Sequence, residues 1–213
     1  MSTPPEPVTL TRQPPVGRLS FEEFLEWADE DTLAEWVDGE VQFMSPTSSR
    51  DQKLLLFLIK VLGHWVEQNN LGELRSETFL MRLSGAVRRG RLPDLLFVAR
   101  EHLDRLGPTY LDGPADLVIE IVSPDSVERD RKDKFGEYER AGVPEYWLLD
   151  PLAERADFYE LGPDGRYRLA LGGRSGVYRS RALRGFWLEV EWLWQDPLPN
   201  TLDILRRLGL LVG

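Results

Sequence analysis

Residues 116–151 read DLVIEIVSPDSVERDRKDKFGEYERAGVPEYWLLDP, and this stretch decides the fold. Its first eight residues are almost continuously apolar, which is typical of a strand buried on both faces. A charged helix is predicted from about Val127 to Ala141, and Gly142 is suited to end it. The strand EYWLLD follows at 145–150 and stops before Pro151. Strand, helix and strand with short connections indicate a right-handed crossover within a mixed sheet.

Upstream, the pattern predicts a helix, a hairpin, a long helix and two strands. Ser20 and Glu23 have the spacing of a capping box before a short amphipathic helix. EWVDGEVQFM, at 35–44, surrounds Asp38-Gly39, which is a strong hairpin signal. A helix from about Asp51 to Gln68 is apolar around most of its circumference, so we expect it to be buried. ELRSETFLMRL (73–83) and RLPDLLFVA (91–99) are each predicted to be one strand.

Downstream of the deciding stretch, the pattern becomes a β-meander. ADFYEL (156–161), YRLAL (167–171) and GFWLEVEWLW (185–194) are its predicted strands, and Asn200 is a good N-cap for a last short helix. No repeat or long linker divides the chain. We therefore expect a disordered proline-rich tail at 1–17 and one domain at 18–213.

Composition limits the classes of function. The chain has 213 residues, 42% of them apolar and 29% charged, as in a soluble globular protein. The absence of cysteine excludes disulfides and thiolate metal sites. The longest apolar run, 54–59, is too short to span a membrane, so we expect a cytoplasmic protein with no membrane contact. The net charge of −10 argues against a protein that coats nucleic acid without specificity, although basic residues cluster locally at 88–91 and 129–134.

Two carboxylates fall on predicted strands. Asp94 follows Pro93 at the start of one strand, and Glu120 interrupts another at its middle. A carboxylate in a buried strand is costly unless it is paired or binds a cation. Two carboxylates on neighbouring strands can hold Mg²⁺ or Mn²⁺. Alternatively, Asp94 is an ordinary strand-end aspartate, and Glu120 forms a buried ion pair with an arginine.

Lys134 is the third candidate. The chain has only 4 lysines against 22 arginines, so a lysine here is not routine filling of a cationic surface. On the predicted helix, Arg131, Lys134 and Tyr138 have i, i+3 and i+7 spacing and would share one face. The alternative is a solvated lysine in a charged helix. Only the combination with Asp94 and Glu120 indicates a site.

The order of these residues resembles the PD-(D/E)XK nuclease superfamily. More closely, the chain is similar to the Uma-type family of putative restriction endonucleases over roughly residues 18–195. The matching motifs are Asp38-Gly39-Glu40, Met44-Ser45-Pro46, Ser123-Pro124, Asp130-Arg131, Lys134, Tyr138, Gly142-Val143, Glu145-Tyr146-Trp147 and Asp150-Pro151.

The resemblance implies an α/β restriction-endonuclease-like fold: a mixed central sheet flanked by helices, here with an added C-terminal β-meander. It implies a metal-dependent endonuclease that hydrolyses DNA, with Asp94, Glu120 and Lys134 as catalytic residues. Asp94, Glu120 and the Ile121 carbonyl would hold Mg²⁺ or Mn²⁺. A homodimer that cuts both strands is also implied by the family. Further candidates for the site are Glu40, Glu77, Tyr138, Arg131 and Lys132.

Two departures from the family patterns leave a second hypothesis open. The superfamily's usual lysine position, two residues after Glu120, holds Val122, so Lys134 would substitute for it from the following helix. The family also commonly has a histidine near the start of the long helix, where this chain has Asp51. The alternative is therefore a catalytically inactive nuclease-fold module that binds nucleic acid or protein.

Overall fold

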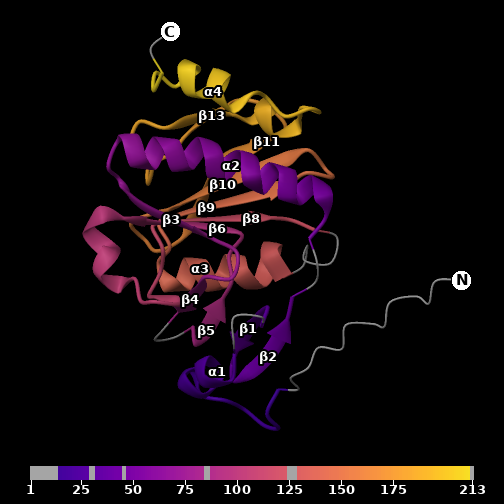
Figure 1. Cartoon of the computed structure of the whole chain (residues 1–213), viewed down its shortest axis with the longest axis vertical. Helices are drawn as coiled ribbons and strands as arrows, with labels where there is room; N and C mark the ends of the chain where they lie inside the picture. The colour runs from indigo at the N-terminus through magenta and orange to yellow at the C-terminus, as the bar shows by residue number, and fades with distance from the viewer. Residues whose placement is uncertain (1–13, 29–31, 45–46, 84–86, 124–128, 212–213) are drawn as a thin grey trace, which may run out of the picture.

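The computed structural model of the chain describes residues 14–28, 32–44, 47–83, 87–123 and 129–211 (Figure 1). Its helices and helical turns are α1 (Phe21–Trp27), α2 (Ser49–Gln68), η1 (Arg100–Arg105), the π-helix η2 (Arg129–Lys134), α3 (Phe135–Ala141), η3 (Val190–Trp194) and α4 (Thr201–Arg207). Its strands are β1 (Ala34–Val37), β2 (Glu40–Phe43), β3 (Gly72–Ser76), β4 (Leu80–Leu83), β5 (Arg89–Arg91), β6 (Leu95–Ala99), β7 (Tyr110–Asp112), β8 (Leu117–Ile121), β9 (Glu145–Asp150), β10 (Arg155–Leu161), β11 (Tyr167–Gly173), β12 (Val177–Arg179) and β13 (Trp187–Glu189).

A mixed six-stranded sheet, in the order β11-β10-β9-β8-β6-β3, forms the centre of the molecule. Strands β8 and β9 are parallel and the other pairs are antiparallel. Helix α3 joins β8 to β9 across one face, and Gly142 ends it with a left-handed φ of 84°. The crossover between parallel strands predicted from 116–151 is confirmed. Residues 127 and 128, the predicted start of its helix, lie outside the described residues.

A second sheet, in the order β2-β1-β5-β4-β7, lies on the far side of α3 (Figure 1). Its β1–β2 hairpin turns at Asp38 and Gly39, which have φ of 50° and 90°. Positive φ at both turn residues fits the right-handed twist of a hairpin, and Asp-Gly accommodates it. The predicted hairpin is therefore confirmed, as is the capping box on α1.

The predicted strand at 73–83 is wrong as a single element. It divides into β3 in the central sheet and β4 in the second sheet, with a break at Thr78, whose φ is 58°. The predicted strand at 91–99 divides in the same way into β5 and β6. Pro93 lies at this break, where its missing N–H cannot continue a ladder. The chain thus passes twice between the sheets, and Asp94 lies at one of these passages.

The predicted C-terminal meander is present in a modified form. Strands β10 and β11 extend the central sheet, whereas β12 and β13 form a separate two-stranded sheet. The predicted strand at 185–194 is wrong beyond Glu189, because η3 follows. Val190, Trp192 and Leu193 are all buried, which strand alternation would not allow on one face. Asn200 caps α4 as expected.

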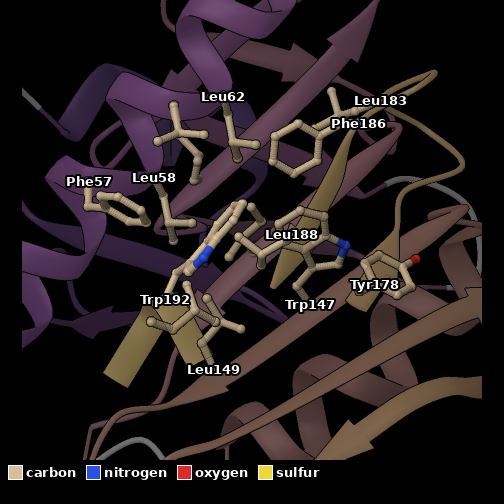
Figure 2. Packing of buried hydrophobic residues seen from close by; sticks show 14 of the residues in the cluster. Phe57, Leu58, Leu62, Trp147, Leu149, Tyr178, Leu183, Phe186, Leu188 and Trp192 are labelled. Atoms are coloured by element: carbon tan, nitrogen blue, oxygen red, sulfur yellow. The ribbon is translucent and has the colours of Figure 1, made fainter. Parts of the chain in front are cut away.

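The largest hydrophobic core lies between the central sheet and α2 (Figure 2). Phe57, Leu58 and Leu62 of α2 pack there, with Trp147 and Leu149 of β9 among the residues from the opposite side. This confirms that α2 is a largely buried helix. Among the described residues, no helix has the length and apolarity to cross a bilayer.

Candidate active site

Asp94 and Glu120 are brought face to face by the register of the central sheet. Leu95 of β6 lies opposite Ile119 of β8 in an antiparallel pair. One residue further along this register, Asp94 meets Glu120, and directly opposed residues project from the same face of a sheet. The Asp94 carboxylate also accepts a hydrogen bond of 2.6 Å from the Ile121 N–H. The two carboxylates predicted from sequence therefore do lie together.

Lys134 reaches the same place from the helical crossover. Its Nζ is 2.8 Å from Glu120 Oε1 and 3.6 Å from Asp130 Oδ1. The Tyr138 hydroxyl, one turn later on α3, donates a hydrogen bond of 2.7 Å to the same Glu120 oxygen. Only 1% of Lys134 and 2% of Glu120 are exposed. The solvated-lysine alternative is excluded by this burial.

Glu35, which the sequence interpretation missed, completes the set of carboxylates around Lys134. It is fully buried in β1 and lies 3.5 Å from Lys134 Nζ. The predicted candidate in this hairpin was Glu40, which is exposed on the second arm. Ala34, Glu35 and Trp36 are all buried, so β1 is covered on both faces. The sequence of such a strand does not alternate between apolar and polar residues, and this pattern therefore could not show that Glu35 is buried and Glu40 exposed.

A second group of charges supports Glu35. Arg91 lies opposite Glu35 when the β1–β5 register is extended by one residue, and the two side chains are 2.6 Å apart. Arg91 also contacts Glu137 of α3 at 2.7 Å, and Arg89 contacts Glu137 at 2.8 Å. Helix α3 therefore connects the sheets electrostatically: Glu137 faces the second sheet, whereas Lys134 and Tyr138 face Glu120.

Burial and neighbouring charge set the protonation of these groups. Burial raises the pKa of Asp94 to about 6 and that of Glu120 to about 8, although the charge of Lys134 opposes both shifts. Burial also disfavours the charged form of Glu35, but Lys134 and Arg91 outweigh it and hold the pKa of Glu35 below its usual value. For Lys134, burial lowers the pKa, yet the surrounding carboxylates, Glu120 foremost, raise it overall. Lys134 is therefore a charged donor in this state.

The remaining predicted site residues divide into those near the site and those outside it. Arg131 does not share a face with Lys134. Its guanidinium contacts Asp150 at 3.1 Å and Asp157 at 3.3 Å instead. The reason is that residues 129–134 form a π-helix, so the expected i, i+3 alignment fails. Lys132 is exposed, whereas Lys134 is buried.

Glu77 lies beside Asp94, and both Glu77 and Asp51 have structural partners. Glu77 lies in the turn after β3, where its N–H donates to the Asp94 carbonyl at 3.2 Å and its carboxylate accepts from Gln52 at 2.8 Å. Asp51 is buried in the first turn of α2, hydrogen-bonded by Ser48 at 2.7 Å. In this chain, the position where the family commonly has histidine therefore contributes to helix capping.

The surroundings of Val122 are unsuitable for the lysine that the superfamily usually has at this strand position. This side chain is 1% exposed and belongs to the hydrophobic cluster that also contains Tyr138 and Leu148. An ammonium group at that position would be buried among apolar side chains, at a high desolvation cost. Lys134 reaches Glu120 from the helix instead.

The donor set suits a hard divalent cation. Both contacts described for Glu120 end on Oε1, and the one for Asp94 ends on Oδ2, so each carboxylate has a second oxygen available. Oxygen ligands from one or two carboxylates are typical of Mg²⁺. Within the described residues, no group of three or more acidic or histidine side chains converges closely enough to form a cation site alone. Any cation here would need water, the Ile121 carbonyl or a substrate oxygen as well.

Comparison with known proteins places the chain in a family and agrees with its fold. The family model Uma2, described as putative restriction endonuclease, matches residues 21–191. The crystal structure of a putative nuclease belonging to DUF820 from Anabaena variabilis ATCC 29413 is similar, with a TM-score of 0.70 and 15% sequence identity. The similarity covers 83% of this chain and 97% of that one, and at this identity it shows the fold alone. No curated protein matches the chain.

Proposed function

The chain belongs to the Uma2 family of putative restriction endonucleases, and from that premise we propose that it hydrolyses phosphodiester bonds of DNA with Mg²⁺ or Mn²⁺. One observation carries the proposal: Asp94 and Glu120 oppose each other across β6 and β8, with the Lys134 ammonium 2.8 Å from Glu120. This arrangement combines anionic oxygens for a cation with a cationic donor for a phosphate or water.

Asp94 and Glu120 would hold the metal, with the Ile121 carbonyl as a further ligand. When bound, a divalent cation supplies positive charge against the scissile phosphate and acidifies water beside it. The Ile121 N–H keeps the Asp94 carboxylate in place, and the Tyr138 hydroxyl does the same for Glu120. Because hydrogen bonds already fix the orientation of both carboxylates, they could bind a cation without first rearranging.

Lys134 would act as a hydrogen-bond donor rather than as a base. The carboxylates around it raise its pKa, so it retains its proton near neutral pH. A charged ammonium can orient the attacking water or stabilise negative charge on the phosphate during hydrolysis. Glu35 is a positioning residue in this scheme, because it contacts Lys134 and Arg91 and not the metal ligands.

The test is cleavage of plasmid DNA by Glu120→Gln. This substitution keeps the shape of the side chain and removes its charge, so we expect the rate with Mg²⁺ or Mn²⁺ to fall on the order of a hundredfold or more. Glu40→Gln is the matched control, since Glu40 is exposed and should leave the rate unchanged. Cleavage by the wild type that persists in EDTA would refute the metal-dependent mechanism.

The burial of Glu120 and Lys134 favours a second candidate function. Glu120 and Lys134 are almost fully buried and lie 2.8 Å apart, so each charged group already has a partner without a metal or a substrate. In this hypothesis the chain is a catalytically inactive module that binds nucleic acid or protein. A melting temperature that does not change across millimolar Mn²⁺, together with no cleavage, would favour this candidate.

Double-strand cleavage would need two such sites. A homodimer would supply them, and we include it in the proposal because the family resemblance implies it. Size-exclusion chromatography with light scattering tests this part independently of activity. A strictly monomeric protein that still cuts both strands would contradict it.

A further inference from the structure

A groove of about 890 Å³ lies between the outer side of α2 and the segment 193–201 that leads into α4. We propose that this groove binds a single-stranded stretch of DNA beside the scissile phosphate. The inference rests on the proposed function, because it assigns the groove to the same substrate. Three observations carry it: the charge of the groove, an aromatic side chain that lines it, and the position of the groove relative to the site.

The charge of the groove is opposite to that of the whole chain. Arg50, Lys53 and Lys60 line it from α2, and Glu154 and Asp196 are its acidic residues. The local balance is positive in a chain whose net charge is −10, and the groove contains two of the four lysines.

These α2 cations are placed to meet an extended anion. All three are exposed, and their spacing along the helix puts them on the side that faces away from the core. Neither Lys53 nor Lys60 has an ion-pair partner within 4 Å among the described residues, so both ammonium groups are available. Phosphates bind such cations by releasing counterions.

An aromatic ring lines the same groove. Trp194 is half-buried at the end of η3, and its Nε1 donates 3.0 Å to the Arg174 carbonyl, which fixes the indole. Single-stranded nucleic acid binds where cations follow the backbone and an aromatic ring stacks on bases. Paired bases are already stacked within a duplex, so this combination favours an unpaired strand.

The position of the groove joins it to the candidate active site. Its lining starts at Ser49 and Arg50 in the first turn of α2 and includes Pro151 after β9. In that same turn, Gln52 donates to Glu77, whose N–H donates to the Asp94 carbonyl. Pro151 also follows the carboxyl end of β9, and Glu120 lies near the carboxyl end of the parallel strand β8. Glu120 faces α3, whereas α2 packs on the other face of the sheet, so a strand leaving the site would pass around this edge of the sheet to reach the groove.

The experiment measures binding separately from cleavage. A fluorescent 20-nucleotide single strand and the matching duplex are titrated with the full chain in EDTA, over a range of salt concentrations. We compare the wild type with the double variant Lys53→Gln/Lys60→Gln. Two lost phosphate contacts should reduce the slope of log affinity against log salt by about 1.4, and weaken single-strand binding on the order of tenfold.

The matched control is Arg181→Gln/Arg184→Gln, which removes the same charge from exposed positions outside the groove. The Arg181 backbone N–H contacts Glu145 at the amino end of β9, so this turn lies at the opposite edge of the sheet from Pro151. The control should leave the salt slope unchanged. An equal slope for both double variants, or tighter binding to the duplex than to the single strand, would overturn the inference.

Trp194 gives a second, independent measurement. Trp194→Ala should weaken single-strand binding by about tenfold, whereas Trp194→Phe should retain most of it, because a ring still stacks. Equal affinities of these two variants, with melting temperatures that show both are folded, would overturn the stacking role. Wild-type protein that binds the strand with the expected slope but never cleaves would leave the inference standing and reject the proposed function.

Discussion

At the scale of single residues, the central feature is one buried lysine among several carboxylates. Lys134 contacts Glu120, Glu35 and Asp130, all of them nearly inaccessible to solvent. A buried ion pair adds little net stability, but removing one partner leaves uncompensated charge in the interior. The stability of the fold therefore depends on Lys134 whether or not the site is catalytic.

Lys134→Met should destabilise the protein by about 3–5 kcal/mol at pH 7, because it leaves buried carboxylates without their cation. Urea unfolding at pH 7 and at pH 5 provides the measurement. The loss should be smaller at pH 5, where the buried carboxyl groups can take up protons. Lys132→Met is the control, since its exposed side chain should contribute less than about 1 kcal/mol. Equal losses for the two lysines would contradict the described burial.

At the scale of elements, α3 is the part that positions the site. It carries Tyr138 and Glu137 toward different sheets, and Lys134 immediately precedes it. The helix ends at Gly142, whose left-handed φ of 84° costs an L side chain energy even though nothing lies within 4 Å of an added Cβ. The carboxyl end of the helix therefore depends on a backbone conformation that glycine adopts without strain.

Gly142→Ala should destabilise the protein by about 1 kcal/mol, because alanine is strained in the left-handed region. Gly136→Ala is the opposite case on the same helix. An added Cβ there meets only the end of the Arg140 side chain at 3.5 Å, so alanine should stabilise by about 0.5–1 kcal/mol through helix propensity. Urea midpoints of the two variants measure the difference, and a shift of the same sign in both would disprove this account.

At the scale of the whole molecule, two carboxyl groups with raised pKa values link stability to pH and metal. Because the folded-state pKa of Asp94 is about 6 and that of Glu120 about 8, folding favours their protonated forms. Their contribution to stability is complete below the unfolded-state values near pH 4, and it is lost as pH rises through 6 and then 8. A cation that binds both carboxylates must displace these protons.

The melting temperature of the metal-free protein should therefore fall between about pH 5 and pH 9, and stabilisation by Mn²⁺ should increase over the same range. At a hundredfold excess over the dissociation constant, occupancy adds about 2.7 kcal/mol, which corresponds to roughly 5–10 °C for a chain of this size. Thermal melts at pH 6 and pH 8.5, with EDTA or Mn²⁺, give both trends. An equal Mn²⁺ shift at the two pH values would argue against these ligands.

Most elements of the fold were predictable because their signals are local. The capping box at Ser20, the Asp-Gly hairpin and the apolar strand around Glu120 depend on residues close in sequence. The division of 73–83 between the sheets was not predictable in this way, whereas Pro93 is a local signal for the division of 91–99. The break at Thr78 shows no proline or glycine, and it becomes visible only because β3 and β4 pair with strands of different sheets.

By itself the sequence determined the strand–helix–strand crossover of 116–151 and the three candidates Asp94, Glu120 and Lys134, since a carboxylate in an apolar strand and a rare lysine are visible without coordinates. Only the tertiary structure decided that Glu35 rather than Glu40 joins them, and that Arg131 turns away to Asp150. The physical reason is that the partner of a charged side chain is set by its distance in the folded structure and not by its separation in the sequence. The register between β1 and β5, and the wider turn of the π-helix, set those pairings among residues far apart in the chain.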